Sequence, residues 1–145
     1  MKRIFVILIT GICISELLAT AEETEKQDLV LDLTCTLPAS GYEVDSGVVV
    51  ARLYEYDPRL ADAAAGEIAK VTVSGLTHKK GRNTVIRIPL HGKRSVQKNY
   101  YVTVFVHPST GTQRLYFVDG FQKVFTSTDD ETLQIVLQPV DKENK

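Results

Sequence analysis

Cysteine is scarce in this chain of 145 residues, which contains only two. Cys13 lies in an apolar N-terminal run, and no paired-cysteine spacing of the kind that binds zinc is present. Cys35 alternates in phase with four leucines: Leu29, Leu31, Leu33 and Leu37. We therefore expect Cys35 to be a buried, reduced core residue, with an intermolecular disulfide as the alternative, and no internal disulfide after export.

Motifs of catalysis and metal binding are also missing. The histidines lack a metal-ligand spacing and the serines lack a nucleophile-elbow pattern: His78, His91, His107, Ser46, Ser74, Ser95 and Ser109. Asp129, Asp130 and Glu131 lie in a polar loop without the spaced oxygen ligands of a calcium site. The sequence therefore predicts a protein that is not an enzyme and that uses no metal or cofactor.

Acidic residues are absent from positions 68 to 118, which hold nine Lys or Arg, whereas positions 22 to 67 hold eleven acids and three bases. One interpretation is that strands from these segments are neighbours and neutralise each other on a solvated surface. The other is a partner-binding patch built from two loops at one end of the fold: Lys79, Lys80, Arg82, Lys93, Arg94 and Lys98. Nucleic acid is a poor partner, because the isoelectric point is near 6.3 and the bases lack interleaved aromatic residues.

The N-terminus has the pattern of a secretion signal. Lys2 and Arg3 precede an apolar run from Ile4 to Ile14, and Ala19-Thr20-Ala21 matches a small-residue cleavage site. A membrane span needs about 20 apolar residues, more than this run supplies. We expect residues 1–21 to be removed, without lipidation at Cys13 because Ile12 precedes it, and the chain to be exported to the periplasm or beyond.

Period-2 alternation of apolar and polar residues runs through most of the remaining chain and predicts about eight strands. They cover residues 29–37, 47–56, 67–76, 84–90, 99–108, 113–119, 121–126 and 132–140. Tyrosines at 54, 56, 100, 101 and 116 are typical of carbohydrate or peptide surfaces, but strands favour tyrosine in any case. The stretch "DPRLADAAAG" is too short for a helix of consequence.

Short strands with turn signals between them and no crossover helices indicate an all-β fold, a single antiparallel β-sandwich of about seven to eight short strands. We expect it to occupy residues 28–140. A disordered stretch at 22–27 would precede it and a charged tail at 141–145 would follow it.

Part of the sequence resembles a known family. The loop residues Asp57, Leu60, Ala61, Asp62 and Ala63 match a "D-x-x-L-A-D-A" pattern, and a later hairpin matches "G-x-L-x-F-x-x-D" at Gly111, Leu115, Phe117 and Val118 to Gly120. On these residues the chain, from about 29 to 138, is similar to the YscW-type domain of type III secretion pilotin lipoproteins. Those pilotins are lipidated, whereas this chain has no acceptable lipid-attachment cysteine.

The resemblance implies a small β-sandwich of the bacterial envelope that, in pilotins, escorts an outer-membrane secretin subunit. We therefore expect a non-enzymatic, chaperone- or pilotin-like binding module that docks a polypeptide through a sheet edge or an apolar groove. The alternative is a sandwich that binds a glycan or another anionic surface through its basic loops.

Overall fold

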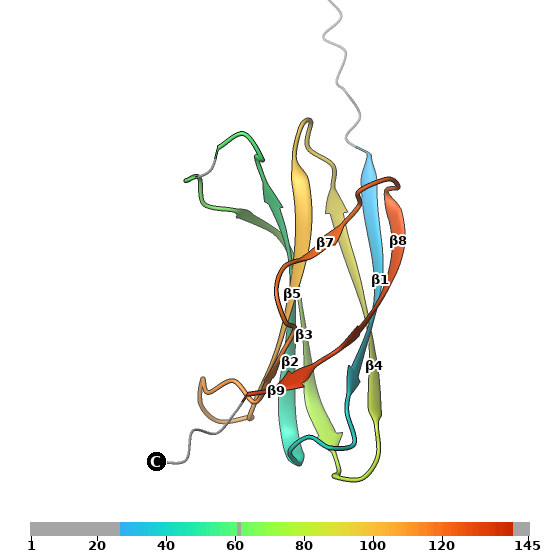
Figure 1. Cartoon of the computed structure of the whole chain (residues 1–145), viewed down its shortest axis with the longest axis vertical. Coiled ribbons are helices and arrows are strands. Elements are labelled where there is room, and N and C mark those ends of the chain that lie inside the picture. Colours follow the sequence, from blue (N-terminus) through green and yellow to red (C-terminus); the bar gives the residue numbers. More distant parts are fainter. Residues whose placement is uncertain (1–26, 61, 141–145) are drawn as a thin grey trace, which may run out of the picture.

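The computed structural model describes residues 27–60 and 62–140, which form two sheets packed face to face (Figure 1). The described residues contain nine strands and no helix, so the predicted all-β sandwich is confirmed. The predicted signal peptide (1–21), residues 22–26 and the predicted tail (141–145) lie outside the described residues.

The strands are long in the first part of the chain and short in the second. Their bounds are β1 Asp28–Leu37, β2 Val44–Tyr56, β3 Gly66–His78, β4 Thr84–Lys93, β5 Asn99–His107, β6 Tyr116–Phe117, β7 Gln122–Val124, β8 Asp130–Val136 and β9 Gln138–Pro139. The small sheet has the order β4-β1-β8, and the large sheet has the order β3-β2-β5-β6-β9 with β7 also paired to β5.

All strand pairs are antiparallel except β1 and β8, which run parallel. This one parallel pair departs from the antiparallel pairing that the sequence predicts. The physical reason is the crossing between the sheets. The chain leaves β7 at the end of the molecule where β1 begins, so β8 enters the small sheet there and runs in the same direction as β1 (Figure 1).

Three predicted strands are shorter or divided in the structure. The segment 113–119 pairs regularly only at Tyr116–Phe117, and 121–126 pairs only at Gln122–Val124. A left-handed backbone at Phe125 (φ 56°) follows β7 and turns the chain away from the large sheet. The segment 132–140 divides between the sheets, because β8 pairs with β1 whereas β9 pairs with β6.

The core lies between the two sheets and follows the alternation seen in the sequence. Every second residue of β1 is fully buried, including Cys35, whose predicted burial is confirmed. The inward positions of β2 and β5 complete the layer: Val49, Ala51, Leu53, Tyr100, Val102, Val104 and Val106. Each large apolar side chain buried in this way contributes about 1.5 to 3 kcal/mol, which is why the strand register is well determined.

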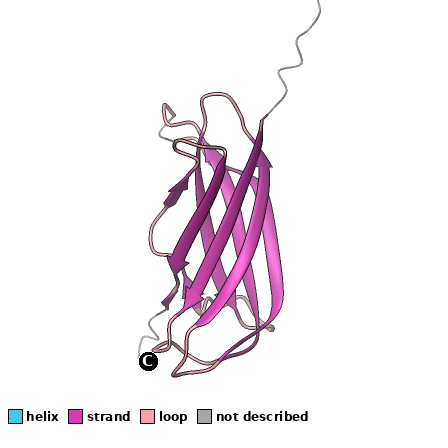
Figure 2. Ribbon diagram, turned by 90° about the vertical axis from the view of Figure 1, so that its right-hand side faces the viewer, coloured by secondary structure: helices cyan, strands magenta, loops and turns pink. Residues whose placement is uncertain are grey.

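The strands run along the long axis, so the loops gather at two ends (Figures 1 and 2). The end where β1 begins, called the upper end here, carries the loops 57–65, 94–98 and 125–129. The lower end carries the loops 38–43, 79–83 and 108–115. Because β4 connects the loops 79–83 and 94–98, these two loops lie at opposite ends of the sandwich.

Candidate functional site

The outer surfaces of the two sheets differ in chemistry. The outward positions of the small sheet carry short polar, charged and β-branched side chains and no phenylalanine or tyrosine: Asp32, Thr34, Thr36, Val85, Arg87, Pro89, His91, Asp130, Thr132, Gln134 and Val136. This surface is typical of a solvated face of a sandwich.

The outward positions of the large sheet are rich in aromatic rings. Since Val49, Ala51 and Leu53 point into the core, the alternate residues of β2 and their cross-strand partners point outward. We call this surface the aromatic face: Val48, Val50, Arg52, Tyr54, Tyr56, Glu67, Lys70, Thr72, Ser74, Tyr101, Thr103, Phe105, His107, Phe117 and Lys123. Its rings are half-buried, which leaves rigid apolar area available to a partner.

The upper part of the aromatic face is a cluster of rings around Tyr101. Tyr54 stacks on Tyr101 with ring centroids 5.1 Å apart, and Phe121 meets the same ring edge-on at 5.0 Å. The ring centroid of Tyr56 lies 5.9 Å from that of Tyr101. Phe121 is 74% exposed, an unusual value for a phenylalanine that is not in contact with another chain.

A hollow of about 360 Å³ opens beside this cluster. It is lined mostly by apolar groups from β2, the loop 57–65, β5 and the segment around β7: Tyr56, Ala63, Ala65, Tyr101, Phe121 and Lys123. Small alanine side chains form one wall and aromatic rings the other. The hollow is therefore an apolar recess between a loop and the ring cluster.

Asp57 positions the loop that forms the alanine wall. Its carboxylate accepts hydrogen bonds from the side chain and the backbone N–H of Arg59, and Lys98 of the neighbouring upper loop lies 3.6 Å away. The Arg59 hydrogen bonds, with a smaller contribution from Lys98, hold the pKa of this carboxyl well below its usual range. The first residue of the family-like loop pattern therefore joins two loops at the upper end.

The lower part of the aromatic face centres on Phe105. The guanidinium of Arg114 lies 3.9 Å from the centroid of its ring, and Phe117 is its cross-strand partner. A cation this close to a ring face is held by the ring quadrupole, which fixes an otherwise long and mobile side chain. The result is a positive charge presented on an aromatic support.

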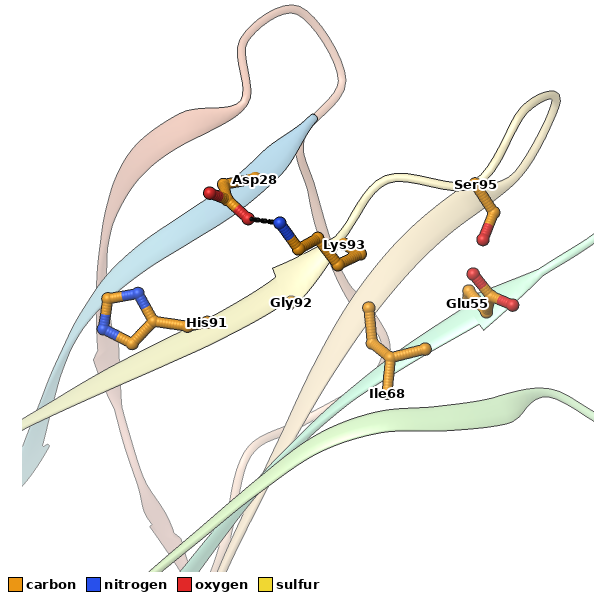
Figure 3. Close-up of a pocket in the computed structure, with 7 residues that line it drawn as sticks. All are labelled: Asp28, Glu55, Ile68, His91, Gly92, Lys93 and Ser95. Atoms are coloured by element: carbon orange, nitrogen blue, oxygen red, sulfur yellow. Dashed lines mark ion pairs between the residues drawn. The ribbon is translucent and has the colours of Figure 1, made fainter. Parts of the chain in front are cut away.

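A second opening is a notch of about 540 Å³ at the upper end, where the two sheets separate between β3 and β4 (Figure 3). Ile68 and Gly92 form its base, and the Asp28–Lys93 ion pair lies along one side. Glu55 and Ser95 point toward each other across the other side (Figure 3). One Glu55 carboxylate oxygen, Oε2, is buried without a hydrogen-bond partner among the described residues. The notch therefore combines opposite charges with apolar lining and has no one dominant ligand chemistry.

The structure does not bring the six sequence-predicted basic residues together. Lys79, Lys80 and Arg82 lie in the lower hairpin between β3 and β4, whereas Lys93, Arg94 and Lys98 lie at the upper end. Ten residues of β4 separate the two groups by about 30 Å, at about 3.3 Å per residue. The expectation of one patch is therefore wrong, because consecutive loops on either side of one strand lie at opposite ends of a sandwich.

The two basic groups also differ in their partners. Each upper cation is in an ion pair with an acid: Lys93 with Asp28, Arg94 with Asp129, and Lys98 with Asp57. The three lower cations are exposed, and within residues 27–60 and 62–140 none of them has an ion pair. Their role in binding stays a prediction.

Among the described residues, no group of three or more His, Cys, Asp or Glu is arranged so that it could hold a metal ion. The three histidines differ in burial and in their neighbours. His78 is buried, with Nδ1 2.8 Å from the hydroxyl of Thr84, whereas His91 is exposed and His107 lies beside Phe105.

No helix of the described residues is long and apolar enough to cross a membrane.

The sequence interpretation missed several residues on or beside the aromatic face. It gives no sign of Phe121, Lys123, Arg114 or Ala65, because they lie in turns or in a short strand whose pairing the alternation does not reveal. Ala63 was noted only as part of the loop pattern. A usable signal was present in "LYEY" and "NYYVTVFV", where Tyr54 and Tyr56 are two positions apart and Tyr101 and Phe105 are four positions apart. Such spacing places rings on one side of a strand.

No protein-family model matches the sequence, and no curated protein matches it. Among solved structures, the fold is similar to that of an alternative pilotin from the type II secretion system of Vibrio cholerae, with a TM-score of 0.56 and 19% identity. The match covers 79% of this chain and 97% of the pilotin. The chain has a pilotin-like fold. At this identity the similarity shows the fold alone, and it does not distinguish the YscW-type domain from other pilotins.

Proposed function

We propose that this chain is a non-enzymatic binding module of the bacterial envelope that docks a polypeptide partner on the aromatic face. The observation that carries the proposal is the contrast between the two outer surfaces: one has no phenylalanine or tyrosine at its outward positions, and the other presents half-buried rings beside an apolar hollow. Rigid aromatic side chains around a pocket are the groups that contribute most to protein–protein binding.

The pilotin-like fold and the predicted secretion signal support the envelope location and the kind of partner. The YscW-type resemblance makes an outer-membrane secretin subunit the first candidate for that partner. Export would place both proteins on the same side of the inner membrane, where they could meet. Docking of this kind does not require a catalytic group.

The test is photo-crosslinking in the native bacterium. p-Benzoyl-phenylalanine replaces Phe121 on the aromatic side or Val85 on the small sheet, which is 59% exposed and serves as the control. The proposal expects one discrete crosslinked polypeptide from position 121 and none from position 85. Equal crosslinking from both positions, or none from either, would contradict docking on this face. A discrete crosslinked partner other than a secretin would support docking on this face and exclude a secretin as the partner.

The second candidate function is binding of a glycan or another anionic surface through the lower hairpin. The observation in its favour is that Lys79, Lys80 and Arg82 are exposed and have no ion pair with a described residue. Replacing all three with Gln should abolish salt-sensitive retention on heparin or on anionic vesicles and leave the melting temperature unchanged. Unchanged retention would exclude this candidate.

A further inference from the structure

We infer that the partner segment recognised by the aromatic face is acidic, with carboxylates against the cations of that face and one apolar side chain in the hollow beside Phe121. The inference rests on the proposed function and specifies the chemistry of its partner. It is carried by three features of the face: unpaired cations, an absence of acids around Phe105, and the distance between the cations and the hollow.

Three cations have no carboxylate partner among the described residues: Lys70 and Lys123 on the face, and Arg114, which lies beside it over Phe105. All three are exposed, although Arg114 is held over the Phe105 ring. A fourth, Arg52, lies 3.5 Å from Glu67, and its Nε is buried without a hydrogen-bond partner. A cation held over a ring, as Arg114 is, favours an opposite charge that arrives with an apolar group.

Acids are absent from the middle and lower parts of this surface. The chain has no Asp or Glu from Val48 to Tyr54 or from Ile68 to Val118, and these ranges supply most of the face. Glu67, the acid that lies on the face, is paired with Arg52, and Asp62 and Asp119 belong to segments flanking the hollow. An acidic partner therefore meets attraction across the face, whereas a basic one meets repulsion.

The spacing of these features limits the length of the partner segment. Tyr101 borders the hollow and Phe105, beneath Arg114, is four residues further along β5, a separation of about 13 Å at about 3.3 Å per residue. An extended chain covers this distance in about four residues. The partner motif is therefore an aromatic or long aliphatic residue with a carboxylate close to it, opposite Lys123, and another about four positions away, opposite Arg114.

The experiment selects binders from a random twelve-residue peptide library displayed on phage, with the domain of residues 22–145 immobilised. The expected sequences combine Asp or Glu with Phe, Trp or Leu. A synthetic peptide from this selection should bind Lys123→Glu about fivefold and Phe121→Ser about tenfold more weakly than the unmodified domain, and its affinity should fall as salt rises.

Matched controls repeat both changes on the small sheet. Arg87→Glu reverses an exposed strand cation, and Val136→Ser removes an apolar side chain that is 62% exposed. Both should leave the affinity within about twofold, with melting temperatures showing that all four variants fold. Since all four positions are exposed, folding should be unaffected.

The outcomes separate this inference from the proposed function. Selected peptides that are neutral or basic, or whose affinity Lys123→Glu and Phe121→Ser leave unchanged, overturn the acidic partner but leave polypeptide docking in place. Enrichment of no peptide above an unrelated sandwich domain overturns both. Displacement of the acidic peptide by heparin and equally by any polyanion would identify a general anion surface and also overturn the inference.

Discussion

Gly41 is the position where a single methyl group should do most damage to the fold. It lies in the buried part of the lower turn 38–43, and a Cβ there would stand 2.8 and 2.9 Å from two ring carbons of Tyr116 and closer still to its hydroxyl oxygen. Tyr116 is fully buried, donates a hydrogen bond from its hydroxyl to the backbone carbonyl of Tyr42, and packs edge-on against Tyr42 and His78. The ring therefore cannot move aside freely.

The cost of Gly41→Ala follows from these contacts. Overpacking a filled core costs about 1 to 3 kcal/mol, and displacing the Tyr116 hydroxyl loses a hydrogen bond worth about 0.5 to 1.5 kcal/mol. We expect a loss of about 3 kcal/mol in the free energy of unfolding, measured from urea denaturation curves. For a domain of this size, that lowers the melting temperature by about 10 °C.

A double-mutant cycle tests the reasoning. Tyr116→Phe removes the oxygen that lies nearest to the new methyl group, so the double variant should be destabilised by less than the sum of the single changes. Gly66→Ala is the control, because the nearest atom to its Cβ is Cγ of Glu55 at an ordinary 3.7 Å. A loss below about 0.5 kcal/mol for Gly41→Ala, or strict additivity in the cycle, would refute the packing explanation.

Three further predictions concern the core, the upper loops and export. Burial raises the pKa of the Cys35 thiol to about 12, so a thiol reagent at pH 8 should label the native protein far more slowly than the unfolded one; rapid native labelling would contradict the burial. The pKa of Asp57 is lowered by Arg59, so its stabilisation is present above the unfolded value of about 3.9 and is lost as the pH falls below it. The difference in urea midpoint between the unmodified protein and Asp57→Asn should therefore be constant above about pH 5 and shrink toward pH 2, and a pH-independent difference would exclude this origin. The exported chain should begin at Glu22 without an acyl group, which intact mass spectrometry checks; a mass that retains residues 1–21 or includes a lipid would reject cleavage after Ala21.

The strands that alternate strictly could be predicted from the sequence. In β1, each of the residues Leu29, Leu31, Leu33, Cys35 and Leu37 is fully buried, as the period-2 pattern indicates. The pattern contains no information about which strand pairs with which over long distances. The parallel pairing of β1 with β8 joins residues about a hundred positions apart, and it depends on where the chain crosses between sheets.

The candidate site was harder to predict because its residues come from segments of different kinds. Tyr54 and Tyr101 could be assigned to strands from the sequence, but their stacking requires the β2–β5 register. Phe121 and Lys123 reach the same surface through β7, which has only three residues and no alternation of its own. Short strands held by one neighbour have no reliable local signal, so the hollow could not be predicted.

The segregation of charge along the sequence separates into two parts once the strands are placed. At the upper end, Lys93 and Lys98 of the acid-free segment pair with Asp28 and Asp57 of the acidic segment, which is the neutralisation expected of neighbouring elements. Lys70 and Arg114 have no such acidic partner among the described residues. They lie on or beside the outer face of β2, β3 and β5, and the segment 68–118, which supplies much of this face, contains no acid. Solubility alone does not require uncompensated charge to coincide with half-buried aromatic rings, since the small sheet is solvated without them. The coincidence on one face is the reason to place the partner there rather than on the basic loops.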